Sequence, residues 1–194
     1  GIPSPLPPEA EWPSWSPEDD EYRRVAVTGR FLHEHETLVH GLMRAQRGQP
    51  VQGYDVLTPL RLADGALVIV NRGFVPTDLA DPERRREGQV AGAVTVTGLL
   101  RTPQARNPFL PANEPAKNRW FVRSPAEIAE AKGLRRVAPF LVDADATPVP
   151  GGWPKGGQTR LEFPNNHLQY AFTWFGLGLT LVGVFVAFAR RRLK

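Results

Sequence analysis

The sequence predicts a mainly β protein: an antiparallel, barrel- or sandwich-like soluble domain with one short helix, followed by a C-terminal transmembrane α-helix. Three observations predict this class. Apolar and polar residues alternate through most of residues 22–163, as they do in half-buried strands. The run Ser124-Pro125-Ala126-Glu127 has the spacing of a helix capping box. The chain ends in an apolar run, residues 168–189, that carries no charged side chain.

Alternation and turn residues place the strands. The clearest pair is a hairpin of residues 54–62 and 66–74, because Ala63-Asp64-Gly65 is a short loop whose Asp-Gly pair tolerates positive φ. Leu67-Val68-Ile69-Val70 is apolar on both faces, which is typical of a central strand. Gly29 is a candidate bulge. The remaining predicted strands cover residues 22–33, 37–45, 90–100, 120–123, 140–143 and 158–163.

The short helix is predicted over residues 125–132, with Pro125 at its first position and Gly133 placed to end it. Residues 1–20 contain six prolines and no periodicity, so they are interpreted as an extended linker. Trp12 and Trp15 of this linker could dock on the domain or touch a membrane surface. The chain thus divides into a Pro-rich linker (1–20), an extracytoplasmic β-rich domain (21–163), a transmembrane helix (164–189) and a basic cytoplasmic tail (190–194).

The apolar run from Leu168 to Ala189 would be about 33 Å long as a helix with a rise of about 1.5 Å per residue, against a hydrocarbon thickness of roughly 30 Å. A buried core helix is the alternative, but such helices seldom run so far without a charge. Arg190, Arg191, Arg192 and Lys194 form the cationic flank typical of the cytoplasmic side. We therefore expect the β-rich domain to lie outside the cytoplasm.

Charge and composition exclude several classes of function. The net charge is +4, but residues 190–194 hold four cations, which leaves 20 basic and 20 acidic side chains in residues 1–189. Arg84-Arg85-Arg86 and Arg135-Arg136 are too short and too mixed with acids to form a nucleic-acid face, so we expect them to be solvated. No cysteine is present, which excludes thiolate catalysis and covalent c-type haem attachment. No nucleophile or phosphate-loop motif is found, so no enzyme is predicted.

Two histidine patterns are candidate metal ligands. His33 and His35 would point to the same side of a strand and could share an ion with His40, or they could simply form a solvated strand end. His167 begins the apolar run, and at 3.6 residues per turn Tyr170, Ala171, Trp174 and Gly178 follow on one stripe. That stripe would let a flat macrocycle lie against the helix while the imidazole reaches its iron. An interfacial histidine above an ordinary aromatic belt is the alternative.

Two longer runs and three shorter ones resemble the Surfeit locus protein 1 family over about residues 25–177. The longer runs are Asn71-Arg72-Gly73-Phe74-Val75-Pro76, after Gly53-Tyr54-Asp55-Val56 and Thr58-Pro59-Leu60, and Asn165-Asn166-His167-Leu168-Gln169-Tyr170-Ala171 with Thr173-Trp174-Phe175. The shorter ones are Gly29-Arg30-Phe31, Gly98-Leu99-Leu100-Arg101 and Asn118-Arg119-Trp120. The family's first membrane helix, with its Gly-x-Trp-Gln pattern, is missing here, and no initiating Met is present, so we expect a fragment of a longer product.

The resemblance implies a membrane-anchored factor that assists assembly of haem-copper cytochrome c oxidase by delivering or stabilising haem a for subunit I. Subunit I, membrane lipid and haem A synthase are the implied partners. The implied location is the bacterial cytoplasmic (inner) membrane with the main domain in the periplasm, or the mitochondrial inner membrane. A histidine of the family's second membrane helix is associated with haem a and maps onto His167, with Tyr170 and Trp174 beside it. A cofactor-free scaffold and copper handling through His33 and His35 are the alternatives.

Arg72 follows a fully apolar strand and precedes another apolar pair. It could therefore form an internal ion pair, or it could present a cation to an anion such as a haem propionate. The neighbouring Gly73 would permit a close backbone approach or a bulge.

Overall fold

The computed structural model describes residues 2–44, 50–104, 110–157 and 167–192, and the chain divides into two compact units, residues 1–159 and 160–194. The first unit is built on a seven-stranded sheet in the order β1-β2-β6-β7-β5-β4-β3, in which β2 also pairs with β4. The strands are β1 (Ser4–Pro5), β2 (Arg24–Phe31), β3 (Thr37–Arg44), β4 (Pro50–Arg61), β5 (Leu67–Pro76), β6 (Ala93–Arg101) and β7 (Val137–Ala144).

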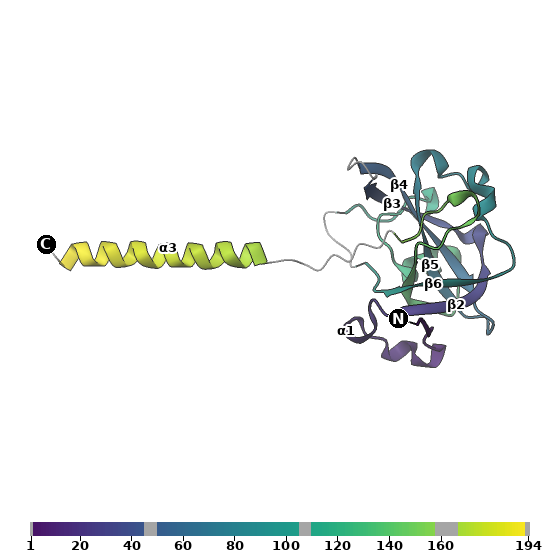
Figure 1. Ribbon diagram of the computed structural model, residues 1–194, viewed down its shortest axis with the longest axis horizontal. Helices are drawn as coiled ribbons and strands as arrows, with labels where there is room; N and C mark the ends of the chain where they lie inside the picture. The colour runs from purple at the N-terminus through teal and green to yellow at the C-terminus, as the bar shows by residue number, and fades with distance from the viewer. Residues whose placement is uncertain (1, 45–49, 105–109, 158–166, 193–194) are drawn as a thin grey trace. The chain divides into compact units, whose positions relative to one another are not determined.

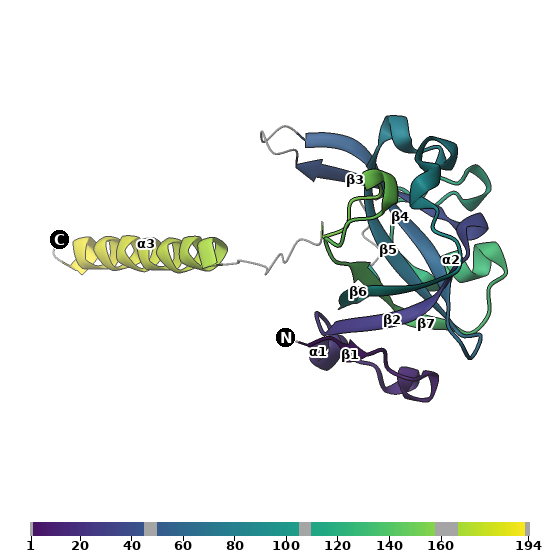
Figure 2. The same cartoon turned by 45° about the vertical axis from the view of Figure 1, so that its right-hand side comes forward.

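The pairing of β2 with β4 closes β2, β6, β7, β5 and β4 into a five-stranded barrel (Figure 1). The predicted mainly β fold is confirmed, and of its two forms the barrel is the one found. All pairs within the ring are antiparallel except β5 with β7. Figure 2 shows the strands of the ring crossing around a common interior, with α2 at the side.

Gly29 lies where β2 leaves β6 and reaches β4. A Cβ atom at this position would lie 2.5 Å from the carbonyl oxygen of Arg61, so a larger residue would hold the two strands apart. The register of β2 with β6 continues through the Gly29–Val94 pair, so the predicted bulge is absent there. The glycine instead allows the backbone contact that closes the barrel.

The predicted hairpin is confirmed as β4 and β5. Arg61 pairs with Leu67, the Leu62 amide donates to the Ala66 carbonyl at 2.8 Å, and Gly65 takes a φ of 86° in the turn. The strand β5 is buried along Leu67–Val75, as its doubly apolar sequence indicates. It therefore has packed neighbours on both of its faces.

Two side-chain clusters account for this burial. The inner faces of all five barrel strands contribute to one core that includes Val27, Leu60, Val68, Leu100 and Phe140. The outer faces of β4, β5 and β7 form a second cluster, in which Leu57, Ile69 and Leu141 pack with Trp120 and Ile128.

Ile128 belongs to α2 (Pro125–Lys132), which has the bounds that the capping signals predict. The Ser124 side chain accepts a hydrogen bond from the Glu127 amide, and Gly133 ends the helix with a φ of 63°. The other short helices are α1 (Pro17–Asp20), η1 (Glu9–Ser14), η2 (His33–His35), η3 (Thr77–Leu79), η4 (Pro82–Gly88), η5 (Pro115–Lys117) and η6 (Pro150–Gly152).

The N-terminal segment differs from the expected extended linker. It forms β1, η1 and α1, and β1 pairs in parallel with β2. Trp12 is buried, donates from Nε1 to the Pro7 carbonyl at 3.0 Å, and meets the Phe140 ring edge-on at 6.1 Å. Trp15 lies 5.7 Å from the same ring. Of the two expected positions for these tryptophans, docking on the domain is the one found, because their rings bury apolar area that the barrel alone leaves uncovered.

Two of the predicted strands have no counterpart among the strands that the structure describes. Residues 120–123 are not a strand, because Trp120 makes only an isolated parallel bridge with Val39. The side chain of Trp120 is instead buried in the second core cluster, and this packing determines the course of the loop backbone. The strand predicted at 158–163 lies outside the described residues.

The second unit contains α3 (His167–Arg192), which continues three residues past the predicted end at Ala189 because arginine is a good helix former. Within the described residues it is the one helix long and apolar enough to cross a membrane, with a mean hydropathy of 1.6 over Thr173–Arg190. Its described apolar side chains are exposed, including Phe175 at 75% and Leu179 at 75%. Water is a poor solvent for such a surface.

Candidate functional site

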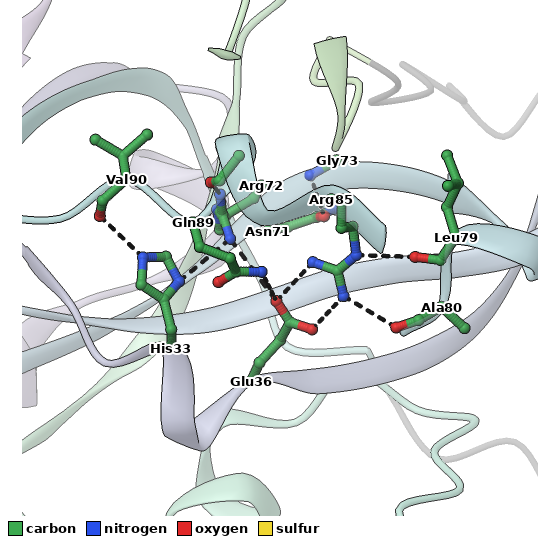
Figure 3. Close-up of polar contacts among 11 residues, drawn as sticks. His33, Glu36, Asn71, Arg72, Gly73, Leu79, Ala80, Arg85, Gln89 and Val90 are labelled. Atoms are coloured by element: carbon green, nitrogen blue, oxygen red, sulfur yellow. Dashed lines mark hydrogen bonds and ion pairs between the residues drawn. The ribbon is translucent and has the colours of Figure 1, made fainter. Parts of the chain in front are cut away.

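One end of the barrel holds a cavity of about 260 Å³. A group of buried charged side chains, shown in Figure 3, lies beside it. The lining comes from the ends of β2 and β7, the middle of β5, the first half of β6 and the segment after β7, and most of it is apolar. It consists of Phe31, Val70, Arg72, Val90, Val94, Thr95, Val96, Thr97, Ala144, Asp145, Thr147, Pro148, Val149 and Pro150.

Glu36 lies between two arginines. Arg85 holds its carboxylate with both terminal nitrogens, with Nη1 at 2.9 Å from Oε2 and Nη2 against Oε1. Arg72 Nη1 lies 3.7 Å from the same Oε2. The exposed fractions of the Glu36, Arg72 and Arg85 side chains are 6%, 4% and 1%, so water screens this group very little.

Backbone carbonyls accept further hydrogen bonds from both guanidinium groups. Arg85 donates from Nε to Leu79 at 2.9 Å and from Nη2 to Ala80 at 3.1 Å. Arg72 donates from Nη2 to the Gly88 carbonyl, and its guanidinium lies 4.9 Å from the centre of the Phe31 ring. The segment η3–η4 therefore folds over the strands because it supplies carbonyl acceptors to buried cations.

His33 is part of the same group. Its Nε2 lies 2.9 Å from the Val90 carbonyl, which can only accept, so Nε2 carries the proton of the neutral ring. Nδ1 then faces Arg72 Nη1 at 3.5 Å as an acceptor. Burial, together with the Arg72 charge, lowers the pKa of His33 below its usual 6.5, although Val90 and Glu36 act in the opposite direction. The ring is therefore neutral near pH 7.

Burial also lowers the pKa of Arg72 to about 10, with Glu36 opposing the shift. A pKa of about 10 still leaves the guanidinium protonated near pH 7. Arg72 is thus a buried cation that faces a largely apolar cavity.

Asn71 and Gly73 explain how the chain holds Arg72 in this position. Asn71 donates from Nδ2 to Asp143 of β7 at 3.1 Å, and its Oδ1 accepts from the Gly73 amide at 3.1 Å. Gly73 has a φ of 120°, and a Cβ atom there would lie 2.1 Å from the Lys155 carbonyl oxygen. Both expectations for Gly73 are confirmed. The paired hydrogen bonds between Phe74 and Lys155 show the close backbone approach, and the register of β4 with β5 shifts between Asp55 and Leu57, opposite Arg72 and Gly73, as at a bulge.

Of the two roles expected for Arg72, the structure shows the internal ion pair, which it forms with Glu36. Its role toward a haem propionate stays a prediction. Arg85 was expected to be solvated, and this is wrong: it is 5% exposed and pairs with Glu36. Its neighbour Arg86 is a surface residue that pairs with Glu83. The sequence did not indicate Glu36 as a partner, since short charged runs such as Glu34–Glu36 and Arg84–Arg86 are ordinary in solvated segments.

The copper alternative rested on a strand that is not present. His33 and His35 lie in the 3₁₀ turn η2, so their side chains do not share one side of a strand. His40 instead stacks on Phe121 with ring centres 4.8 Å apart. In the described part of the chain, no three His, Asp or Glu side chains are placed to hold a metal ion.

The predicted haem stripe lies on α3, in the second unit. The side chains of His167 and Tyr170 lie outside the described residues. Trp174 is 70% exposed, and a Cβ atom at Gly178 would meet nothing within 4 Å, so the described part of the stripe is open. The roles of His167, Tyr170 and Trp174 stay predictions.

These features define a class: a small five-stranded β-barrel domain with a buried arginine site, on a chain that also carries a helix long and apolar enough to cross a membrane. A model of the SURF1 family matches residues 2–179, so the chain belongs to the SURF1 family. This confirms the family resemblance.

Individual relatives agree with this assignment. A SURF1-like protein of Monosiga brevicollis is 40% identical over 181 residues, which cover 89% of this chain and 67% of that protein. Surfeit locus protein 1 of Xenopus tropicalis is 41% identical over 81% of this chain and 54% of its own length, and the human protein of that name is 40% identical over 81% and 55%. The chain thus spans between about half and two thirds of the relatives it matches.

Proposed function

We propose that this protein is a membrane-anchored assembly factor for haem-copper cytochrome c oxidase. Membership of the SURF1 family carries the proposal, because the match extends over residues 2–179 and includes the first half of α3 as well as the barrel. The apolar surface of α3 supports an anchor in the bacterial cytoplasmic membrane or the mitochondrial inner membrane. The protein acts by holding a cofactor or subunit and not by catalysis.

Its cargo in this proposal is haem a on its way to oxidase subunit I, with haem A synthase as the source. His167 supplies the axial imidazole, a common iron ligand in haem proteins, and Tyr170 and Trp174 flank the ring. The face at Trp174 and Gly178 supports this role, since within α3 itself no described side chain covers it. Haem a bound at this level would be held at the membrane in which its acceptor lies.

The barrel cavity is not where this macrocycle would bind. Its volume of about 260 Å³ is below the roughly 300–1,000 Å³ of pockets that take drug-sized ligands and cofactors. This proposal does not use Arg72 as a partner of a haem propionate, because the cavity that Arg72 lines is too small for the macrocycle.

The test is the haem a content of the full-length protein, purified from cells that make haem a. We expect His167→Ala to lose the haem a absorption while an exposed histidine of the domain, changed as His40→Ala, leaves it intact. Equal haem a in both variants would remove His167 as the ligand.

The same two variants separate a haem carrier from a cofactor-free scaffold. Each is returned to a strain that lacks the protein, and oxidase activity is measured. A haem carrier requires His167→Ala to fail and His40→Ala to succeed. Full activity of His167→Ala without bound haem a would favour the scaffold.

A further inference from the structure

The cavity at the end of the barrel combines an apolar lining with one buried cation. Val70, Val94 and Val96 provide much of the wall, and Arg72 is a charged lining residue with a side chain only 4% exposed. A buried charged group is costly unless a counter-charge or hydrogen-bond acceptors satisfy it.

The charges around Arg72 do not balance. Two buried arginines, Arg72 and Arg85, share the single carboxylate of Glu36, and Arg85 takes both of its oxygens at short range. His33 is neutral, so it adds no charge of either sign. The group therefore carries one surplus positive charge, which lies on the cavity side because Arg72 is the more distant partner of Glu36.

Arg72 has donors to spare for a ligand. A guanidinium group has five N–H donors, whereas the contacts with Gly88, Glu36 and His33 use at most three of them. A carboxylate is a suitable acceptor because its two oxygens match the fork of an arginine.

Asp145 is the acid in the lining and would oppose an anion. Its carboxylate is 32% exposed, lies 3.5 Å from Arg24, and accepts from the Thr147 amide at 3.0 Å. It is therefore a rim residue with its own partners, and it leaves the charge on Arg72 uncompensated.

The size of the cavity limits the ligand. An apolar cavity of about 150 Å³ already holds a benzene molecule, and this one measures about 260 Å³. We propose that the barrel cavity binds a small monocarboxylate with an aliphatic chain of a few carbons, its carboxylate on Arg72 and its chain along Val70, Val94 and Val96. The proposal goes beyond oxidase assembly and does not depend on haem at His167.

The test uses the full chain in lipid nanodiscs and hexanoate as the probe, with affinity measured by calorimetry and empty nanodiscs subtracted. Hexan-1-ol keeps the chain without the charge, and acetate keeps the charge without most of the chain. We expect hexanoate to bind at least about tenfold more tightly than either. Binding of hexanoate no tighter than hexan-1-ol would overturn the proposal.

A variant that fills the cavity tests whether hexanoate binds there, and it leaves Arg72 unchanged. Val94 lines the cavity, whereas its neighbour Ala93 is exposed and is not part of the lining. We expect Val94→Phe to weaken hexanoate binding at least about tenfold and Ala93→Phe to leave it unchanged, with circular dichroism showing that both are folded. If Val94→Phe is unfolded, Ala144→Leu replaces it in the same comparison. Unchanged affinity in a folded cavity-filling variant contradicts the site.

Discussion

Glu36 is the residue on which the buried charges depend. Two guanidinium groups, one 1% and one 4% exposed, contact its carboxylate, so its removal would leave both cations in the interior without a counter-charge. Breaking one partner of a buried ion pair is far more destabilising than replacing the whole pair by apolar groups. The Glu36–Arg85 ion pair therefore links the end of η2 to η4.

We predict that Glu36→Gln lowers the free energy of unfolding by about 3–5 kcal/mol, because the amide keeps the shape but not the charge. Urea unfolding followed by tryptophan fluorescence measures the change. Glu83→Gln is the matched control, since Glu83 pairs with Arg86 at the surface with both side chains more than half exposed. Its effect should stay below about 1 kcal/mol. Similar losses in the two variants would refute a special role for Glu36.

His33 gives the domain a pH dependence. Its pKa is lowered in the folded state by burial and by Arg72, with Glu36 and Glu34 opposing, so the unfolded chain binds the proton first as pH falls below about 6.5. We expect its contribution to stability to be complete above pH 6.5 and to be lost as pH falls toward the folded pKa. The stability difference between pH 7.5 and pH 5.5 should therefore be smaller in His33→Gln than in the unaltered chain. If the stability difference were the same in both proteins, the pKa of His33 would not differ between the folded and unfolded states.

At the scale of elements, β5 shows how a glycine can fix a tertiary contact. Gly73 and Gly92 both have positive φ, at 120° and 85°. A Cβ atom at Gly73 would lie 2.1 Å from the Lys155 carbonyl oxygen, whereas one at Gly92 would meet nothing within 4 Å. A side chain at Gly92 would therefore introduce backbone strain alone, whereas one at Gly73 would introduce both backbone strain and a steric clash.

We predict that Gly92→Ala costs about 1–2 kcal/mol of stability through its left-handed backbone. Gly73→Ala should cost more, since the Phe74–Lys155 hydrogen bonds must also separate to admit the methyl group. The two variants are compared by thermal unfolding of the full chain. Equal losses would mean that the close approach at Gly73 contributes nothing.

For the whole molecule, the position of the domain relative to the membrane is a proposal that follows from the arginines at the end of α3. Residues 1–194 contain no cysteine, so a single cysteine placed among them is distinguished from the unaltered protein, which is labelled in parallel as the background. In spheroplasts that express the full-length protein, Glu34→Cys should react with a membrane-impermeant maleimide. Lys194→Cys should react only after the membrane is permeabilised. Labelling of Lys194→Cys in intact spheroplasts would reverse the proposed orientation.

Features with local signals were predictable from the sequence. The bounds of α2 follow from Ser124 and Gly133, and the β4–β5 hairpin follows from its Asp-Gly turn, because capping and turn chemistry involve residues only a few positions apart. The apolar run in α3 is likewise a property of consecutive residues. The stripe at His167 could be located from spacing alone, although its ligand role stays a prediction.

The buried charges could not be predicted in this way. Glu36 and Arg85 are 49 positions apart, and each has charged neighbours that are typical of a solvated segment. Barrel closure at Gly29, the docking of Trp12 on Phe140 and the loop course around Trp120 also depend on partners far away in the chain. The sequence by itself determined the class of elements and the separation into an aqueous and an apolar part. Tertiary structure alone decided which charges are buried, because the cost of burial depends on the atoms that surround a side chain and not on its neighbours in sequence.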